Sequence, residues 1–276
     1  MRSPGWQPAA VYSALAVASL LVMLPVAWMF TVSIRPNGMI FTVPPRWVPA
    51  VLTLEAYRRV LGSPATLRFF FNSYVVAGTT TVASLALAMM AGYGFSRFRF
   101  PGASALRVFI IGTQMIPPIA LVVPYFVVIA ALGLYDSYTA LIATYTSFAL
   151  PFATLMMTSY FDTIPRDLEE AAMVDGCTRL GALRRILAPL TVPGVVATGA
   201  FAFLLAWNEF LFAVTLTQTT SMRTVPVGIA LLMGEHAYEW NVMMALSLLA
   251  SLPLFAVFVF VQRYLIAGLA AGAVKG

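Results

Sequence analysis

Residues 169–176 read Glu-Glu-Ala-Ala-Met-Val-Asp-Gly, a charged, helix-prone segment in a chain that is otherwise mostly apolar. Only 9% of the 276 residues are charged, yet five of the ten acidic residues lie between positions 162 and 175. Long apolar runs flank the segment on both sides. A polar segment of this density between apolar runs indicates a surface where a membrane protein touches a soluble partner.

The composition is that of an integral membrane protein. Hydrophobic residues make up 61% of the chain and the mean hydropathy is +0.90, whereas soluble domains are about half apolar and a quarter charged. The single cysteine, Cys177, excludes an intramolecular disulfide, and with one histidine, His236, it does not make a usual zinc site, so we expect no metal. The only lysine is Lys275, which excludes a phosphate-binding loop ending in Gly-Lys-Ser/Thr. Any ATP must therefore bind to another polypeptide.

Six apolar stretches are long enough to cross a bilayer, because a spanning helix needs about 20 residues. They are residues 11–34, 73–95, 108–132, 138–160, 190–216 and 242–261. The first is too long for the core of a secretory signal, so we expect it to be retained as a span. The sequence therefore predicts an all-α membrane protein with six transmembrane helices in one domain.

The distribution of arginine and lysine predicts the orientation. With the N-terminus inside, ten of these residues lie on the inner side and six on the outer side, five of the six in the long loop 35–72. Because cytoplasmic loops carry the excess of positive charge, we expect both termini inside. The loop 35–72 is then outside, and the segment 162–191 is cytoplasmic. The net charge of +6 follows from these loop edges and does not indicate nucleic-acid binding.

The outer loop contains one helical pattern. Leu54, Tyr57, Val60 and Leu61 share a face at helical spacing. The pattern predicts a short helix over residues 54–61, which either lies on the outer membrane surface or packs on the helix bundle.

The charged segment itself predicts a short helix over residues 165–175. Pro165 suits the first helical turn, where its missing N–H costs nothing. Asp167, Glu169 and Glu170 place negative charge in that turn, which the helix dipole favours. Gly176 is suited to a left-handed stop.

A second helix is expected directly after the stop. Thr178 can cap it, and its apolar face consists of Leu180, Leu183, Ile186 and Leu187. Pro189 and Pro193 mark the return to the membrane.

The spacing of these residues resembles a family signature. Residues 170–172 read Glu-Ala-Ala, Asp-Gly follows at 175–176, and Ile-Leu-Ala-Pro follows at 186–189. This resembles the E-A-A-x2-D-G-x9-I-x-L-P signature of ABC importer permeases, with Ala188 in place of the usual leucine. The resemblance implies that the segment is the coupling helix, which lodges in a groove of a cytoplasmic ATPase. The implied coupling residues are Glu169, Glu170, Ala171, Ala172, Asp175, Gly176 and Arg179.

The resemblance extends over the whole chain, to the G-type, second permease subunit of maltose-transporter-like carbohydrate importers. It rests on Asn72-Ser73 and on the segments AGYGFSRFRFPG at 91–102, MIPP at 115–118, WNEF at 207–210 and GLAAGAVKG at 268–276. It implies the type I ABC importer permease fold. Within the segment 91–102, Gly92 and Gly94 permit close contact between helices.

The third and fifth spans contain residues that suit a translocation pathway. Pro117, Pro118 and Pro124 must kink or break a helix, and free backbone groups in hydrocarbon are tolerated only beside protein or a watery cavity. Glu209 is a charge within a span, either a polar wall of the pathway or a group at the outer helix end. The predicted pathway residues are Gln114, Pro117, Trp207, Asn208 and Glu209.

The outer loop before the last span is polar and aromatic. It contains Glu235, His236, Tyr238, Glu239 and Trp240. The family resemblance implies that this loop probes the sugar cleft of a binding protein. The other interpretation is an aromatic anchor at the membrane interface followed by a plain loop.

We therefore predict a permease subunit of an ATP-driven, binding-protein-dependent importer in the bacterial inner membrane. The implied solute is a carbohydrate or sugar-like compound, such as a disaccharide, an amino sugar or a glycerophosphodiester. The implied partners are a homologous F-type permease, two ATP-binding cassette subunits and an extracytoplasmic solute-binding protein. The chain would not be an enzyme and would hold no cofactor, with ATP and Mg on the partner ATPase.

Two other classes of membrane protein would require features that the sequence lacks. An ion-coupled secondary transporter using Glu209 should show an internal repeat and charges at the midplane, and neither is visible. An intramembrane hydrolase needs a nucleophile and a base within the spans, and no span offers histidine or lysine.

Overall fold

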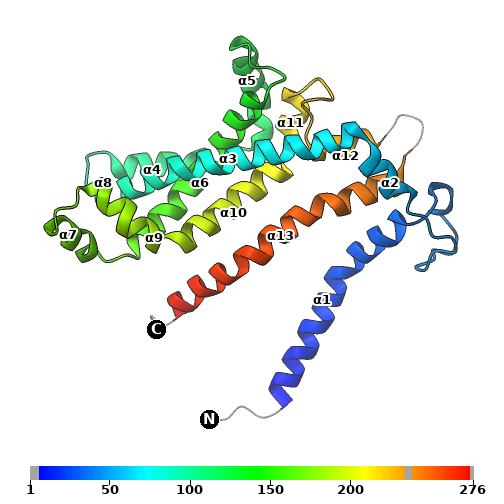
Figure 1. Ribbon diagram of the computed structural model, residues 1–276, viewed down its shortest axis with the longest axis horizontal. Helices are drawn as coiled ribbons and strands as arrows, with labels where there is room; N and C mark the ends of the chain where they lie inside the picture. Colours follow the sequence, from blue (N-terminus) through cyan, green and yellow to red (C-terminus); the bar gives the residue numbers. More distant parts are fainter. Residues whose placement is uncertain (1–5, 234–237, 274–276) are drawn as a thin grey trace. The chain divides into compact units, whose positions relative to one another are not determined.

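The computed structural model describes residues 6–233 and 238–273, which are helical for most of their length (Figure 1). The long helices are α1 (Trp6–Ser33), α3 (Pro64–Arg97), α6 (Tyr138–Asp162), α10 (Val192–Asn208) and α13 (Trp240–Ala273). The shorter helices are α2 (Glu55–Gly62), α4 (Ala103–Thr113), α5 (Pro118–Ala131), α7 (Asp167–Val174), α8 (Arg179–Ala182), α9 (Ala188–Leu190), α11 (Leu211–Leu216) and α12 (Val225–Leu231). A π-helical turn, Leu183–Leu187, joins α8 to α9.

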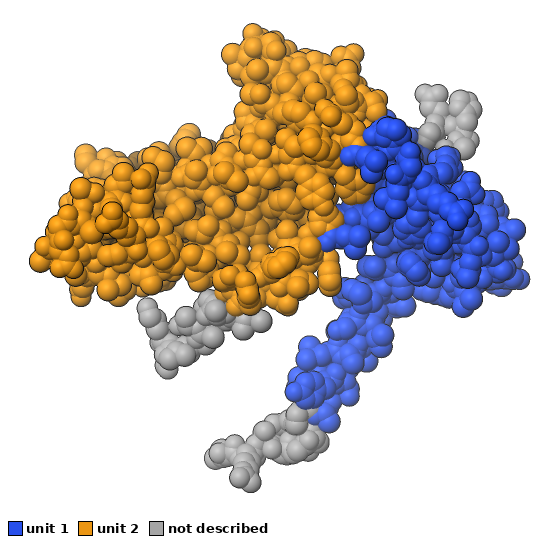
Figure 2. All heavy atoms as spheres, in the orientation of Figure 1, with its two compact units in different colours: residues 1–67, 228–252 blue, residues 68–227, 253–276 orange. Residues whose placement is uncertain are grey.

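The chain divides into two compact units, coloured separately in Figure 2. The first unit comprises residues 1–67 and 228–252 and contains α1 and α2. The second comprises residues 68–227 and 253–276 and contains α4 to α11 with most of α3. The charged segment 162–176 and the breaks in the third and fifth apolar stretches all belong to the second unit.

Four helices are long and apolar enough to cross a membrane singly, and two bent helix pairs bring the number to six among the described residues. The predicted spans 73–95, 138–160 and 242–261 lie within α3, α6 and α13, and the predicted span 11–34 ends one residue past α1. The remaining two predicted spans are not single helices. The break in the third span was predicted from Pro117 and Pro118, whereas the break of the fifth span at Glu209 was not predicted. The described residues therefore form an all-α fold with helices long enough to span a membrane.

The third span breaks at residues 114–117, where α4 and α5 meet at 99°. The break follows from Pro117 and Pro118, because neither can donate the backbone hydrogen bond that would continue α4. Pro118 instead begins α5, where its fixed φ angle favours a new helix. Pro124 lies within α5, so it does not end this helix. Helix α5 packs against α6 through Tyr125, whose hydroxyl lies 2.6 Å from Ser147 Oγ and whose ring lies 5.4 Å from Phe148.

The fifth span is interrupted twice. Residues 179–190 meet α10 at 77°. Helix α10 then ends at Asn208, and Glu209 and Phe210 separate it from α11. Glu209 therefore lies at a helix break, not inside a continuous helix.

The predicted outer helix forms as α2, but its buried face differs from the prediction. Ala56 and Val60 are buried, and the Tyr57 hydroxyl lies 2.8 Å from Ser33 Oγ at the end of α1. Leu54 and Leu61, which were expected on the same face, are 60% and 55% exposed. The contact with Ser33 favours the interpretation that this helix packs on another helix.

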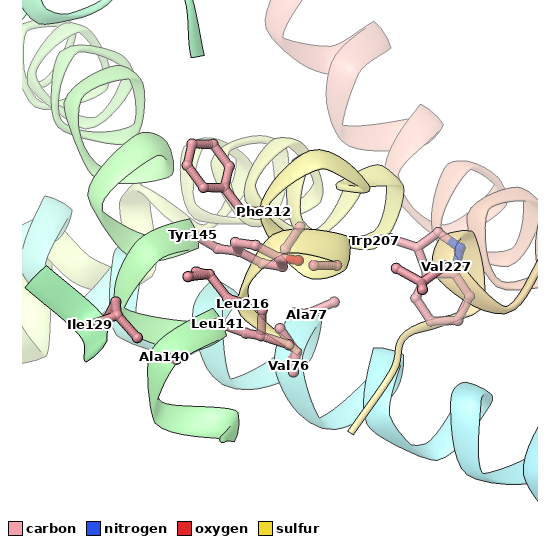
Figure 3. Close-up of a cluster of buried hydrophobic side chains, with 12 residues drawn as sticks. Val76, Ala77, Ile129, Ala140, Leu141, Tyr145, Trp207, Phe212, Leu216 and Val227 are labelled. Carbon is pink, nitrogen blue, oxygen red and sulfur yellow. The ribbon is translucent and has the colours of Figure 1, made fainter. Parts of the chain in front are cut away.

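The core of the second unit draws on α3, α5, α6, α10 and α11, with Val227 of α12 (Figure 3). Its large side chains include Leu141, Tyr145, Trp207 and Phe212, and four alanines are buried in the same cluster: Ala77, Ala140, Ala206 and Ala213. Lipid is as apolar as these side chains, so close packing and not exclusion from water must hold the helices together. Small residues at the contacts are what such packing requires.

Gly92 lies at the closest approach of α3 to α6. A Cβ atom at this position would be 2.8 Å from Met157 Cβ and 2.9 Å from the Thr158 backbone nitrogen. The predicted close contact is therefore confirmed for Gly92. It is wrong for Gly94, where an added Cβ meets nothing within 4 Å.

We predict that Gly92→Ala destabilises the protein by about 1–3 kcal/mol through overpacking. Gly94→Ala is the matched control, because it gains the same helix propensity without the steric conflict. Thermal unfolding of both purified variants in detergent measures the difference. Equal midpoints would show that α3 and α6 are not in close contact at this position.

Candidate functional site

Helix α7 forms where the charged segment predicted it. Asp167, Glu169 and Glu170 lie in its first turn. Gly176 follows with φ of +88°, and Cys177 N donates to Ala172 O over 2.9 Å. This pairing is a Schellman stop, which needs a residue that tolerates the left-handed conformation. The predicted helix and its glycine stop are both confirmed, but α7 begins at Asp167 and Pro165 precedes it instead of lying in its first turn.

Glu169 is buried beneath this helix. Its carboxylate accepts a hydrogen bond of 2.5 Å from the Tyr93 hydroxyl and lies 3.1 Å from Arg97 Nε. Both side chains of the ion pair are less than a tenth exposed. Because such a pair is costly to break once it is desolvated, Glu169 fastens α7 to the end of α3.

Further hydrogen bonds reinforce this attachment. Arg97 donates to Ile164 O over 2.9 Å, and Arg166, the N-cap of α7, donates to Ser96 O over 2.8 Å. Ser96 Oγ in turn donates to Asp162 over 2.5 Å. The end of α3, the end of α6 and the start of α7 are therefore joined directly.

The opposite face of the segment is open. Among the seven sequence-predicted coupling residues, Glu169 and Ala172 are buried, and the others are exposed: Glu170, Ala171, Asp175, Gly176 and Arg179. Val174 is 87% exposed beside them. The exposed surface combines carboxylates with small and apolar side chains, a composition suited to a protein contact.

The second predicted helix forms only in part. Thr178 caps α8 as expected, accepting from Gly181 N over 3.1 Å. The π-helical turn then replaces the regular helix that the sequence predicted. Leu187 is buried, but Leu180 is 56% exposed and does not share its face.

Two of the predicted pathway residues line the same cavity. Gln114, at the break between α4 and α5, and Glu209, at the break between α10 and α11, line one cavity of about 230 Å³. The Glu209 carboxylate also accepts from Phe212 N and Ala213 N over 2.9 and 3.0 Å. These bonds satisfy donors at the start of α11 and lower the cost of a partly buried charge.

The other pathway candidates lie elsewhere. Trp207 is buried, stacked on Phe203 at 5.5 Å and in edge contact with Tyr74 at 4.9 Å. Asn208 is exposed and donates to the Leu204 carbonyl over 2.8 Å. Pro117 does not line the cavity, although its neighbour Pro118 does.

The loop before α13 is described only in part, since Glu235 and His236 lie outside the described residues. Tyr238 stacks on Trp240 with the rings 5.3 Å apart. Glu239 pairs with Arg59 of α2 through contacts of 2.7 and 2.9 Å. The described end of this loop is therefore tied to the loop 35–72.

Sequence reasoning missed Asp136, which fastens two connecting segments together. Its carboxylate accepts from Gln218 N, Thr219 N and Thr219 Oγ1 over 2.8, 3.1 and 2.7 Å. Burial alone would raise the pKa of Asp136, but these hydrogen bonds and the charge of Arg223 outweigh it and lower the pKa. The sequence offered one signal for this role, a single acidic residue in the short connection between two predicted spans.

Asn72 belongs to the same region, and sequence reasoning noted it only as part of a motif. Its amide donates to Ser221 O and Arg223 O, each over 2.8 Å, and its carbonyl accepts from the Tyr138 hydroxyl over 2.7 Å. The side chain is fully buried. It joins α3, α6 and the segment before α12.

Comparisons with known proteins agree with this geometry. The chain is 38% identical over 264 residues to the sulfoquinovosyl glycerol transport system permease protein SmoH of Agrobacterium fabrum, covering 95% of this chain and 93% of that protein. It is 37% identical to the trehalose/maltose transport system permease protein MalG of Thermococcus litoralis, covering 94% and 93%.

A solved structure supports the fold independently. The crystal structure of a bacterial ABC transporter that imports the acidic polysaccharide alginate contains a chain that matches with a TM-score of 0.80. The match has 22% identity and covers 96% of this chain and 99% of that chain. At this identity the likeness shows the fold, which is that of the ABC importer permeases.

Spans, broken helices and an exposed acidic helix define a multi-pass transport protein. Residues 84–270 match the family model of binding-protein-dependent transport system inner membrane components. The chain belongs to this family. Nothing in the comparisons supports an ion-coupled transporter.

We predict that Glu169→Gln destabilises the attachment of α7 by about 3–5 kcal/mol, because it leaves Arg97 buried without its counter-charge. Hydrogen exchange of the α7 amides should then accelerate. Glu170→Gln makes the same chemical change on the exposed face and should leave exchange unchanged. Equal exchange in both variants would contradict the anchoring role.

Proposed function

We propose that this chain is the non-catalytic permease subunit of an ATP-driven importer of a carbohydrate or sugar-like solute. Its place would be the bacterial inner membrane. The proposal draws on family membership and on the two relatives named for sugar-type solutes. The observation that carries it is the exposed face of α7, held rigidly at the end of two spanning helices.

The proposed assembly has three kinds of protein partner. A homologous F-type permease completes the pathway, and two ATP-binding cassette subunits supply ATP and Mg. An extracytoplasmic solute-binding protein delivers the solute. A solved alginate importer with a periplasmic protein carrying an alginate pentasaccharide offers a parallel, with a TM-score of 0.68 and 14% identity.

Coupling would work mechanically. Closure of the ATPase dimer displaces α7 through Glu170, Ala171, Asp175 and Gly176. Glu169 and the bonds around it pass the displacement to α3 and α6, which Gly92 keeps in close contact. The helices then move between inward-open and outward-open arrangements.

The pathway is proposed to pass the cavity shared by Gln114 and Glu209. Both residues lie at helix breaks, where polar backbone groups in a membrane need protein or water beside them. Trp207, Asn208 and Pro117 would support its wall. On the outer side, the loop with Glu235, His236, Tyr238, Glu239 and Trp240 is proposed to meet the binding protein.

We predict that Glu170→Lys in the reconstituted transporter lowers solute-stimulated ATP hydrolysis by more than about tenfold, because it reverses a charge in a protein contact. Gly176→Pro should act similarly by removing the left-handed stop. Glu55→Lys reverses an exposed charge on α2 and should have no effect. Normal stimulation in the Glu170 and Gly176 variants, with the chain inserted, would refute the docking role.

We further predict that the permease subunits purified without the ATPase hydrolyse no ATP, and that adding the ATPase restores hydrolysis. Phosphate release measures both states. Sustained turnover by the permease subunits alone would refute the non-catalytic role.

A further inference from the structure

A second cavity, of about 400 Å³, lies in the second unit between the end of α3, the start of α4 and the segment leading into α7. Arg99, Arg107 and Arg166 line it together with Asp162. Family resemblance and the proposed coupling assign no role to this cavity. Three guanidinium groups around one space point to an anionic ligand.

The charges in this cavity are not balanced by the protein. The ion pairs among the described residues are Arg59–Glu239 and Arg97–Glu169, and neither includes a lining arginine. Asp162 is the one acid in the lining, and its carboxylate already accepts from Ser96. Three positive charges therefore face one negative charge.

The arginines also keep free donors. Arg107 donates one bond to Phe95 O over 2.7 Å, and Arg166 donates one to Ser96 O over 2.8 Å. Arg99 is exposed and makes no hydrogen bond within the described part of the chain. Because each guanidinium carries five N–H donors in a planar fork, the group suits the oxygens of a phosphate.

The surroundings of the cavity favour a lipid as the source of that phosphate. Phe98 and Phe100 line it and are each 40% exposed. Helix α4, which begins at its edge, has no buried residue and exposes Val108 and Phe109 by 69% and 67%. An anionic site bordered by apolar surface fits a headgroup whose acyl chains lie along α4.

We propose that this arginine cavity binds the phosphate of an anionic phospholipid. Its placement on the inner leaflet rests on the proposed orientation, and basic pockets on that side recognise such headgroups. Arg166 lines the cavity and occupies the N-cap position of α7, directly before its first residue. A bound headgroup therefore steadies the coupling helix, and lipid composition affects coupling.

The test uses the purified complete transporter in nanodiscs of phosphatidylcholine mixed with phosphatidylglycerol. Native mass spectrometry measures the phosphatidylglycerol that remains bound. Arg99→Gln should weaken retention about fivefold, and adding Arg107→Gln about fivefold again. Arg99→Lys, which keeps the charge, should retain most binding. The control Arg184→Gln with Arg185→Gln removes two exposed charges outside the cavity and should change little.

Three results would overturn the proposal. Equal loss in the control would mean diffuse attraction instead of a site. A rise in thermal stability with inorganic phosphate in lipid-free detergent, abolished by Arg99→Gln while phosphatidylglycerol retention stays unchanged, would make the ligand free phosphate. Loss of the ATPase subunits from Arg99→Gln with unchanged lipid retention would make the cavity a protein contact.

Lipid retention is measured without ATP, so it separates this proposal from the proposed function. Retention that follows the variants would support the lipid site even if the Glu170 variants showed normal coupling. In that case only the coupling role would fail.

Discussion

The buried ion pair between Glu169 and Arg97, with the Tyr93 hydroxyl on the same carboxylate, is the constraint on which the rest of the structure depends. A helix of eight residues is too short to be stable alone, since isolated helices need about 12–15 residues. The pair gives α7 its stability by attaching it to a spanning helix. The attachment also fixes which face remains open. Glu169 holds the helix in place, and the neighbouring Glu170 remains exposed.

The spanning helices face a different problem, because burial from water does not drive them together in lipid. Their association depends on surfaces that match closely. Gly92 meets the backbone of α6, and alanines of α3, α6, α10 and α11 are buried in the core. The lack of a side chain at Gly92 therefore contributes to helix packing as much as the side chains around it. This makes the second unit sensitive to single added methyl groups at a few positions.

The sequence predicted most of the fold, and the failures have physical reasons. Apolar runs, proline at a helix start and glycine at a helix stop are local signals, so four continuous spans, α7 and its end at Gly176 followed from them. Burial of Glu169 did not, because its partners Tyr93 and Arg97 are far away in the chain. Gln114 and Glu209 line one cavity because of two helix breaks. Local sequence does not determine the angles at these breaks. Asp136 and Asn72 bind backbone groups of distant loops, which leave no pattern of their own.

The polar ties made by Asn72 and Asp136 have a mechanical consequence. They bind one end of α3, the start of α6 and the segment 217–223 into a block that resists separation. The bonds around Glu169 and Arg166 lie at the other end of α3 and α6, and roughly 38 Å of helix separates Asn72 from Arg97. Such an arrangement holds α3 and α6 together at both ends. A displacement of ~3 Å at the Arg97 end would tilt the two helices by ~5° about the end that Asn72 holds.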